Sequence, residues 1–315
     1  MKNPILISTA AYDGYDLATA FKEISRAGVD LVEIAFIEGY TDPFTEDYFN
    51  DDNVVNINAL LAEYNLLCPS FSSHVDLSRE GIVEVFKNRM AFAKKIGSKY
   101  IVTNAAPLEN KSQFMQNIQK LGQTAAGLEM VIVLENPGDG KANVMDSGEP
   151  AANLIDEIGQ KNIKINYDFG NLLSHCFEKI RPQEDYKFVR DCAVHYHIKD
   201  VASDDAGWYF TEIGQGTIDY QKILKELAVL SEPVPISLEI PLRIRRAPDA
   251  SPRRTSQPVD LAEIRANVVN ANTSVIGMRQ PVDLSTGTFR WTDDTHMALY
   301  LGKAILDALG NHDLA

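Results

Sequence analysis

The chain alternates two kinds of segment along most of its length. Short apolar runs rich in β-branched residues are typical of buried strands, and longer segments with apolar residues every three or four positions are typical of amphipathic helices. The helical patterns include residues 15–28, 81–97, 111–127 and 219–230. Eight strands are predicted: Ile5–Ser8, Leu31–Phe36, Leu66–His74, Tyr100–Asn104, Val131–Asn136, Ile163–Asp168, Val194–Lys199 and Ile236–Leu242.

Eight strands that alternate with helices indicate parallel pairing through right-handed crossovers, and they close into an α/β fold of the (β/α)8 TIM barrel type. The alternative is a doubly wound open sheet, but no predicted strand leads into a glycine-rich dinucleotide motif or a phosphate loop. We assign residues 1–277 to a single barrel domain and residues 278–315 to a C-terminal extension. An amphipathic helix is predicted over residues 291–306 of that extension.

The segment from Arg243 to Arg254 interrupts this alternation after the eighth predicted strand. It is rich in arginine and contains two prolines. Its composition predicts a loop rather than a helix or strand. Two interpretations of this loop stay open, a solvated tether or a surface that binds the substrate or a partner.

Composition narrows the class of function. The chain has 315 residues, with 30 Lys and Arg against 44 Asp and Glu, for a formal net charge of −14. This acidic balance argues against a protein that grips nucleic acid or an anionic membrane. No apolar run approaches membrane-spanning length, and three cysteines are too few and scattered for a disulfide framework or a thiolate zinc site. We therefore expect a cytoplasmic protein with reduced thiols.

Ligand-type side chains stand near the ends of the last four predicted strands: Glu135, Asp168, His197 and Glu239. The carboxyl ends of barrel strands form the mouth, so these side chains are expected to converge. Three carboxylates so close together repel one another, and a cation offsets that cost. Oxygen and nitrogen ligands without a thiolate suit Mn²⁺, Mg²⁺ or Co²⁺ and tolerate Zn²⁺.

The ordered motifs LENPGDG, YDFGN, HIKD and SLEIP on strands five to eight resemble those of the sugar phosphate isomerase and epimerase superfamily, the xylose isomerase-like TIM barrels. The resemblance covers about residues 5–275. It implies that Glu135, Asp168, His197 and Glu239 bind a divalent metal, with Mn²⁺ expected first. It also implies that Glu135 and Glu239 act as a catalytic acid and base pair on a sugar substrate.

Two positions depart from the ketose epimerases of that superfamily. Asn171 stands where those enzymes have a histidine, and Lys199 and Asp200 follow the seventh-strand histidine in place of a substrate-binding arginine. The HIKD and DFGN motifs are more similar to dehydratases and lyases that act on keto-sugars. One such group is the large subunit of C-glycoside deglycosidases, which works on a 3-keto glycoside with a small partner subunit.

The resulting prediction is a metal-dependent enzyme that abstracts a proton α to a carbonyl of a sugar or keto-sugar, through a metal-stabilised enediolate. A lyase of the deglycosidase type, an apurinic-endonuclease-like phosphodiesterase and a non-catalytic sugar-binding barrel are the alternatives. A sugar or glycoside is the expected small-molecule partner. The protein is also expected to form a homo-oligomer.

Several other polar residues are candidates for the same site. His74 is a further acid or base or a structural hydrogen-bonding residue, and Lys199 either stabilises an oxyanion or pairs with Asp200 or Glu212. Glu33 is either a pocket acid or a partner for an interior base, and His195 is expected deeper in the barrel. The candidate substrate-binding residues are Asn104, Asn136, Asn171 and Trp208.

Overall fold

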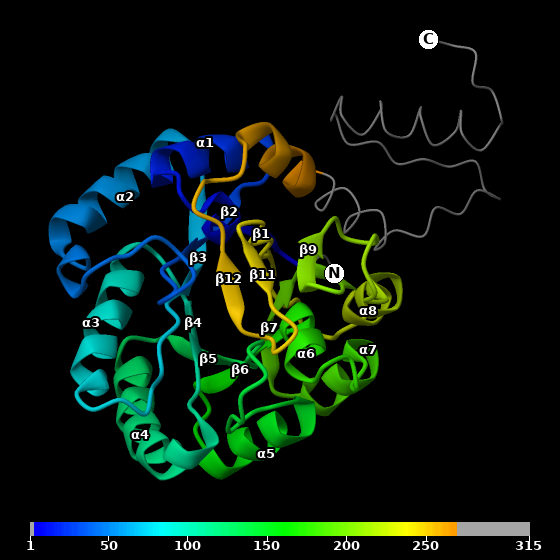
Figure 1. Ribbon diagram of the computed structural model, residues 1–315. Coiled ribbons are helices and arrows are strands. Elements are labelled where there is room, and N and C mark those ends of the chain that lie inside the picture. The colour runs from blue at the N-terminus through cyan, green and yellow to red at the C-terminus, as the bar shows by residue number, and fades with distance from the viewer. Residues whose placement is uncertain (1–2, 270–315) are drawn as a thin grey trace.

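The computed structural model describes residues 3–269 and contains a closed barrel of eight parallel strands (Figure 1). The predicted fold class is therefore confirmed, and each barrel strand overlaps a predicted one. Around the barrel the strands follow the order β1-β10-β7-β6-β5-β4-β3-β2. They are β1 (Ile5–Ser8), β2 (Leu31–Ala35), β3 (Leu67–Ser72), β4 (Tyr100–Asn104), β5 (Val131–Glu135), β6 (Ile163–Asp168), β7 (Ala193–Ile198) and β10 (Ile236–Leu238).

Helices surround the barrel as an outer layer, and they include all four helices predicted from the sequence. The α-helices are α1 (Leu17–Arg26), α2 (Asp51–Glu63), α3 (Ile82–Lys95), α4 (Lys111–Gly127), α5 (Gly148–Ile158), α6 (Phe169–His175), α7 (Pro182–Asp185) and α8 (Tyr220–Leu227), followed by helical residues 261–269. Short 3-10 turns lie at η1 (Thr9–Tyr12), η2 (Glu46–Tyr48), η3 (Leu108–Asn110) and η4 (Tyr186–Val189).

Local sequence explains where α1 and α6 begin. Asp16 caps α1 by accepting from the Thr19 amide at 2.8 Å, as a side chain at this position commonly does. Asp168 ends β6 and caps α6 by accepting from the Asn171 amide at 2.8 Å. The turn that ends the sixth strand therefore also fixes the Asp168 carboxylate at the mouth.

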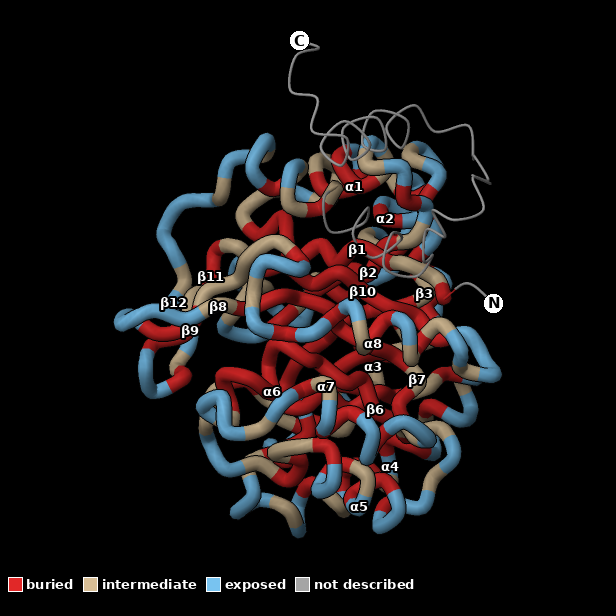
Figure 2. The backbone as a smooth tube through the Cα atoms, turned by 90° about the vertical axis from the view of Figure 1, so that its right-hand side faces the viewer, coloured by how far each residue is buried: buried red, intermediate tan, exposed pale blue. Residues whose placement is uncertain are grey.

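The buried residues lie mainly along the strands and the inward faces of the helices (Figure 2). Apolar side chains such as Ile101, Ile132 and Ile165 are fully buried in this layer. The barrel interior also holds polar groups, among them Glu33 and His195, and both are fully buried. Burial of such groups requires partners, and the site described below supplies them.

The arginine-rich segment is not a loop, so that prediction was wrong. β11 (Ile244–Arg246) and β12 (Pro252–Arg254) join β8 (Asp200–Asp204) and β9 (Gly207–Thr211) in an antiparallel sheet of order β12-β11-β9-β8. The two hairpins follow β7 and β10, and β11 and β12 cross the mouth of the barrel (Figure 1). β11 forms a strand because its backbone groups pair with those of β9. This pairing is a tertiary contact, which the local composition of the segment does not determine.

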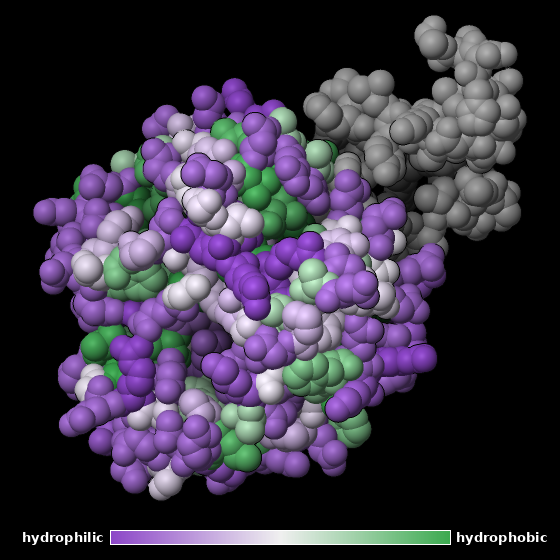
Figure 3. Space-filling model, in the orientation of Figure 1, coloured by the Kyte–Doolittle hydropathy of each residue, from purple (hydrophilic) through white to green (hydrophobic). Residues whose placement is uncertain are grey.

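The mouth face is largely hydrophilic, and strongly hydrophilic residues cross its centre where β11 and β12 lie (Figure 3). Among the described residues no helix is both long and apolar enough to cross a membrane. The predicted extension, residues 278–315 with its helix over 291–306, lies outside the described residues. Its assignment as a separate segment stays a prediction.

Candidate metal centre

Four residues at the ends of four consecutive barrel strands meet at the mouth. They are Glu135 from β5, Asp168 from β6, His197 from β7 and Glu239 just after β10. One potential ligand atom from each residue lies within 4.8 Å of the others. All four side chains are buried. The convergence expected from the strand ends is thus present in the structure.

The imidazole of His197 links this cluster to the barrel interior. Its Nδ1 lies 2.8 Å from Oε2 of Glu135 and 3.5 Å from Oε2 of Glu239, while its Nε2 lies 2.9 Å from Oε1 of Glu33. Burial alone would lower the pKa of His197, but these three carboxylates raise it well above its usual range. One ring nitrogen therefore faces the mouth and the other faces Glu33.

The ammonium of Lys199 is the second cation of the cluster. Its Nζ lies 2.5 Å from Oδ2 of Asp168 and also donates to Oε2 of Glu239. Lys199 does not pair with Asp200 as expected. The Asp200 carboxylate accepts instead from the backbone amides of Gly214 at 2.8 Å and Gly216 at 3.0 Å. Lys199 thus belongs to the site.

The carboxylates of the cluster respond differently to burial. Burial raises the pKa of Asp168 to about 6, with Glu135 and Glu239 adding to the rise and Lys199 opposing it. Burial also acts to raise the pKa of Glu239, but Lys199 and His197 outweigh it and hold that pKa well below its usual value. The two cations close to the cluster leave part of its negative charge for a further cation to neutralise.

These residues fit a divalent metal ion. Oδ2 of Asp168 and Nδ1 of His197 are buried, and their close contacts among the described residues are the charge pairs within the cluster, with Lys199 and with Glu135. Both atoms thus face the centre of the cluster, as metal ligands would. Three carboxylates and one imidazole form an oxygen-rich donor set without thiolate. Such a set suits Mn²⁺, Mg²⁺ or Co²⁺ and accommodates Zn²⁺.

A second buried group lies below the cluster. Glu33 on β2 receives the Ser70 hydroxyl at 2.8 Å and the Ser237 hydroxyl at 3.2 Å, and its Oε2 lies 3.4 Å from Nε2 of His195. Nδ1 of His195 lies 2.8 Å from Oδ1 of Asn166. Burial lowers the pKa of His195 to about 4. Glu33 is thus a partner for interior imidazoles, and it fixes the orientation of the His197 ring.

Replacing Glu33 by glutamine is expected to weaken divalent metal binding by about 10- to 100-fold, because the carboxylate that holds the proton on Nε2 of His197 is lost. Titration of the metal-free protein with Mn²⁺ in a calorimeter measures this change. The matched control is Glu23→Gln. It alters a buried glutamate on α1 that pairs with Arg26 of the same helix and with Arg265, away from the cluster. Equal affinities in both variants would remove Glu33 from the metal site.

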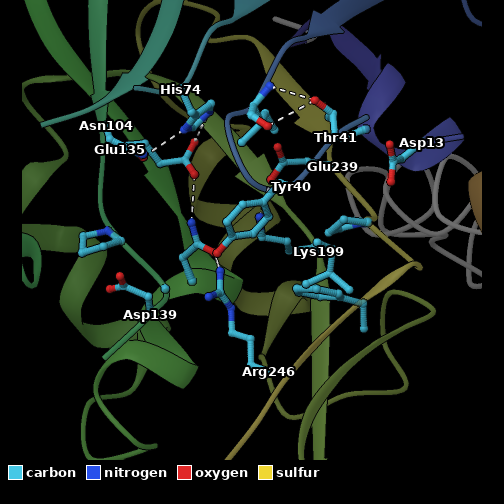
Figure 4. Close-up of a pocket in the computed structure, with 18 of the residues that line it drawn as sticks. Asp13, Tyr40, Thr41, His74, Asn104, Glu135, Asp139, Lys199, Glu239 and Arg246 are labelled. Carbon is cyan, nitrogen blue, oxygen red and sulfur yellow. Dashed lines mark hydrogen bonds and ion pairs between the residues drawn. The ribbon is translucent and has the colours of Figure 1, made fainter. Parts of the chain in front are cut away.

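A cavity of about 220 Å³ opens directly above the cluster (Figure 4). Glu135, Glu239 and Lys199 of the cluster region line it together with His74, Asn104 and Asn171. Nδ1 of His74 donates to Oδ1 of Asn104 at 3.0 Å, and its Nε2 lies 3.7 Å from Oε2 of Glu135. Nδ2 of Asn171 donates to Oε1 of Glu135 at 2.8 Å.

Two candidate substrate-binding residues lie elsewhere. Asn136 joins β5 to β6 through two hydrogen bonds of 2.9 Å with the backbone of Asp168, and it does not line this cavity among the described residues. Trp208 lies on β9, where its indole donates to Glu178 at 2.8 Å and packs against Phe177. The structure therefore brings His74, Lys199, Asn104 and Asn171 to the metal cluster and leaves Asn136 and Trp208 away from the cavity.

The sequence did not single out Tyr40 and Arg246, which also line the cavity. Tyr40 follows β2, and Arg246 belongs to the segment expected to be a loop. The RIRR sequence at the start of that segment was an available signal, because successive side chains of a strand point to opposite faces and Arg245 and Arg246 would therefore face opposite ways.

Comparison with known proteins agrees with the barrel fold. Residues 21–259 match the family described as xylose isomerase-like TIM barrel. The chain belongs to this family. The predicted membership of the xylose isomerase-like barrels is thus confirmed, whereas no observation selects the C-glycoside deglycosidase branch. No curated protein sequence matches the chain significantly.

Solved structures of this xylose isomerase-like fold resemble the chain at low sequence identity. D-psicose 3-epimerase from Clostridium cellulolyticum H10, solved with D-tagatose, aligns with a TM-score of 0.68 at 12% identity over 89% of this chain and 100% of that chain. D-allulose 3-epimerase from Methylomonas sp. in complex with D-allulose gives 0.62 at 18% identity, over 89% and 98%. The probable 3-DHS dehydratase from Bacillus anthracis gives 0.62 at 15% identity, over 89% and 100%.

Proposed function

We propose that the protein is a divalent-metal-dependent enzyme of the sugar isomerase and epimerase type, which removes a proton α to a carbonyl of a sugar or keto-sugar. The observation that carries this proposal is the cluster of Glu135, Asp168, His197 and Glu239, whose potential ligand atoms lie within 4.8 Å of one another below an open cavity. The epimerases among the similar structures support the same class.

In this proposal the four cluster residues hold the ion, which when bound polarises the substrate carbonyl and acidifies the neighbouring C–H bond. Glu135 and Glu239 reach the cavity from β5 and from the end of β10, so a substrate between them presents one face to each. One carboxylate takes the α-proton, and the other group, protonated to the carboxylic acid, gives a proton to the opposite face and becomes the carboxylate. Return to a neighbouring carbon would give isomerisation.

Neighbouring side chains give this acid and base pair its setting. Asn171 and Asn166 donate to the two oxygens of Glu135, at 2.8 Å and 2.5 Å, and fix the direction of the carboxylate. His74 lies beside Glu135 and is placed to donate to a substrate oxygen. Lys199 keeps Glu239 ionised, as a proton acceptor requires.

Elimination is the second candidate reaction, because a probable dehydratase shares this fold. Both reactions begin with loss of the α-proton, and they differ in whether a leaving group departs from the β-carbon. Lys199 is the ammonium closest to the cluster and is placed to protonate a departing oxygen. Product analysis distinguishes the two outcomes.

The small second subunit, the homo-oligomer and the cytoplasmic location stay predictions.

Removal of divalent metal tests the proposal. The protein loaded with Mn²⁺ is expected to catalyse exchange of a substrate C–H with deuterium from solvent, because proton abstraction precedes both epimerisation and elimination. The exchange should cease after chelation and return when Mn²⁺ is added. Proton NMR of D-psicose, D-tagatose, a 3-keto glucoside, D-fructuronate and D-fructose 6-phosphate in D₂O measures the exchange. Metal-independent exchange, or no exchange of any of these five compounds with metal bound, would contradict the proposed function.

A further inference from the structure

Arg246 on β11 is a buried guanidinium that faces the cavity above the metal cluster. Its side chain is 3% exposed and lines the cavity near Tyr40 and Glu135 (Figure 4). Nη2 donates to Oδ1 of Asn171 at 3.1 Å and Nη1 donates to the backbone oxygen of Ala250 at 3.4 Å, whereas Nε has no hydrogen-bond partner among the described residues. Both acceptors are neutral, so within the described part of the chain the positive charge has no counter-ion in direct contact.

Three other arginines of the same segment differ from Arg246 because each has a carboxylate partner, and the fourth, Arg253, is exposed rather than buried. Arg243 lies 3.1 Å from Oδ2 of Asp13, and Arg254 donates to both oxygens of Asp13. Arg245, the neighbour of Arg246 on β11, pairs with both oxygens of the exposed Asp204 at 2.8 Å. Across residues 3–269 no carboxylate lies within ion-pair distance of Arg246.

The surroundings of Arg246 hold it in place without neutralising it. Its guanidinium lies over the Tyr40 ring, with 5.5 Å between Cζ and the ring centre. Gly138 makes room for it, since a Cβ at that position would lie 2.4 Å from Nη2 of Arg246. A buried charge without a counter-ion is unfavourable, and the fork of guanidinium donors matches a carboxylate or a phosphate.

We propose that Arg246 binds an anionic group of the substrate, a carboxylate or a phosphate, beside the metal cluster. This inference rests on the proposed function, and it narrows the substrate from sugars in general to a sugar acid or a sugar phosphate. The hydrogen bonds from Asn171 to Glu135 and from Arg246 to Asn171 place the anion subsite one side chain away from the proposed base.

Calorimetric titration of the metal-loaded protein tests the proposal with D-fructose, D-fructuronate and D-fructose 6-phosphate. At least one of the two anions is expected to bind about 10-fold or more tightly than D-fructose, as charge-assisted hydrogen bonds allow. The preferred anion identifies carboxylate or phosphate as the recognised group. Arg246→Gln should abolish this preference, whereas Arg245→Gln, on the opposite face of the same strand, should keep it.

The thermal midpoint of the ligand-free Arg246→Gln variant separates a binding role from a structural role. Because an uncompensated buried charge is removed, that midpoint should not fall below the wild-type value. A lowered midpoint with an unchanged anion preference would overturn the proposal. So would wild-type protein that binds neither anion more tightly than D-fructose, or equal loss of preference in both variants. Deuterium exchange without an anion preference would refute only this inference, and an anion preference without exchange would refute only the proposed function.

Discussion

Replacing Glu135 or Glu239 by glutamine is expected to slow deuterium exchange of the substrate α-hydrogen by about 100-fold or more, because each change removes a proton acceptor and a negative charge from the cluster. The effect on Glu135 has a further cause. Asn166 and Asn171 both donate to its carboxylate oxygens, and the amide group of glutamine would place a donor against one of them. Exchange rates measured at saturating Mn²⁺ separate lost chemistry from weakened metal binding.

A matched surface change controls for non-specific effects of the glutamine substitutions. Glu157 lies on α5 and pairs with Lys111 at 2.6 Å, outside the cavity. The Glu157→Gln variant should exchange at the wild-type rate. If Glu135→Gln and Glu239→Gln also retained wild-type exchange with metal bound, neither carboxylate would be the base and the proposed pair would be wrong.

The barrel and the position of its candidate site could be predicted from the sequence because both depend on local, regular signals. Apolar runs give the strands, and strand ends of one barrel must share a mouth. Glu135, Asp168, His197 and Glu239 are therefore brought together by topology alone, whatever their surrounding loops do. The confirmed strands around these four residues show that this argument needs no knowledge of the tertiary contacts.

The sheet across the mouth could not be predicted in the same way. β11 and β12 are three residues each, β12 pairs with β11, and β11 pairs with β9 of a hairpin formed about forty residues earlier in the chain. Whether an arginine of the segment has a counter-ion depends on residues such as Asp13 and Asp204, which lie far from the segment in sequence. Side-chain partners that come from distant loops leave no periodic pattern in the sequence. The surroundings of Arg246 could therefore be recognised only in the structure.

The partner of Lys199 shows the same limit within the site itself. Lys199 lies two residues after His197 on the predicted seventh strand, and side chains two residues apart on a strand point to the same face. The sequence therefore indicated that both residues face the mouth. The sequence offered Asp200 and Glu212 as partners, but Asp200 is used by the backbone amides of Gly214 and Gly216. Lys199 turns instead to Asp168 and Glu239, whose positions are set by other strands.

Replacing Lys199 by methionine is expected to destabilise the metal-free protein by about 3–5 kcal/mol, because the change leaves the buried carboxylates of Asp168 and Glu239 without their closest cation. Urea denaturation of the metal-free protein measures the free energy of unfolding. The matched control is Lys222→Met, which breaks an exposed pair with Glu184 and should have a much smaller effect. Equal stability of Lys199→Met and wild type would show that the ammonium does not hold the cluster.

The same variant should depend on pH and on metal in a defined direction. The pKa of Asp168 is raised from 3.8 to about 6 by burial even with Lys199 present, and loss of the ammonium raises it further. A carboxyl group whose pKa is raised in the folded state makes the free energy of unfolding fall as pH rises, because the folded protein binds the proton more tightly than the unfolded chain does. The destabilisation should therefore be smaller near pH 5 than near pH 8. Added Mn²⁺ should stabilise Lys199→Met more than wild type, since a cation that binds the folded state replaces the missing charge.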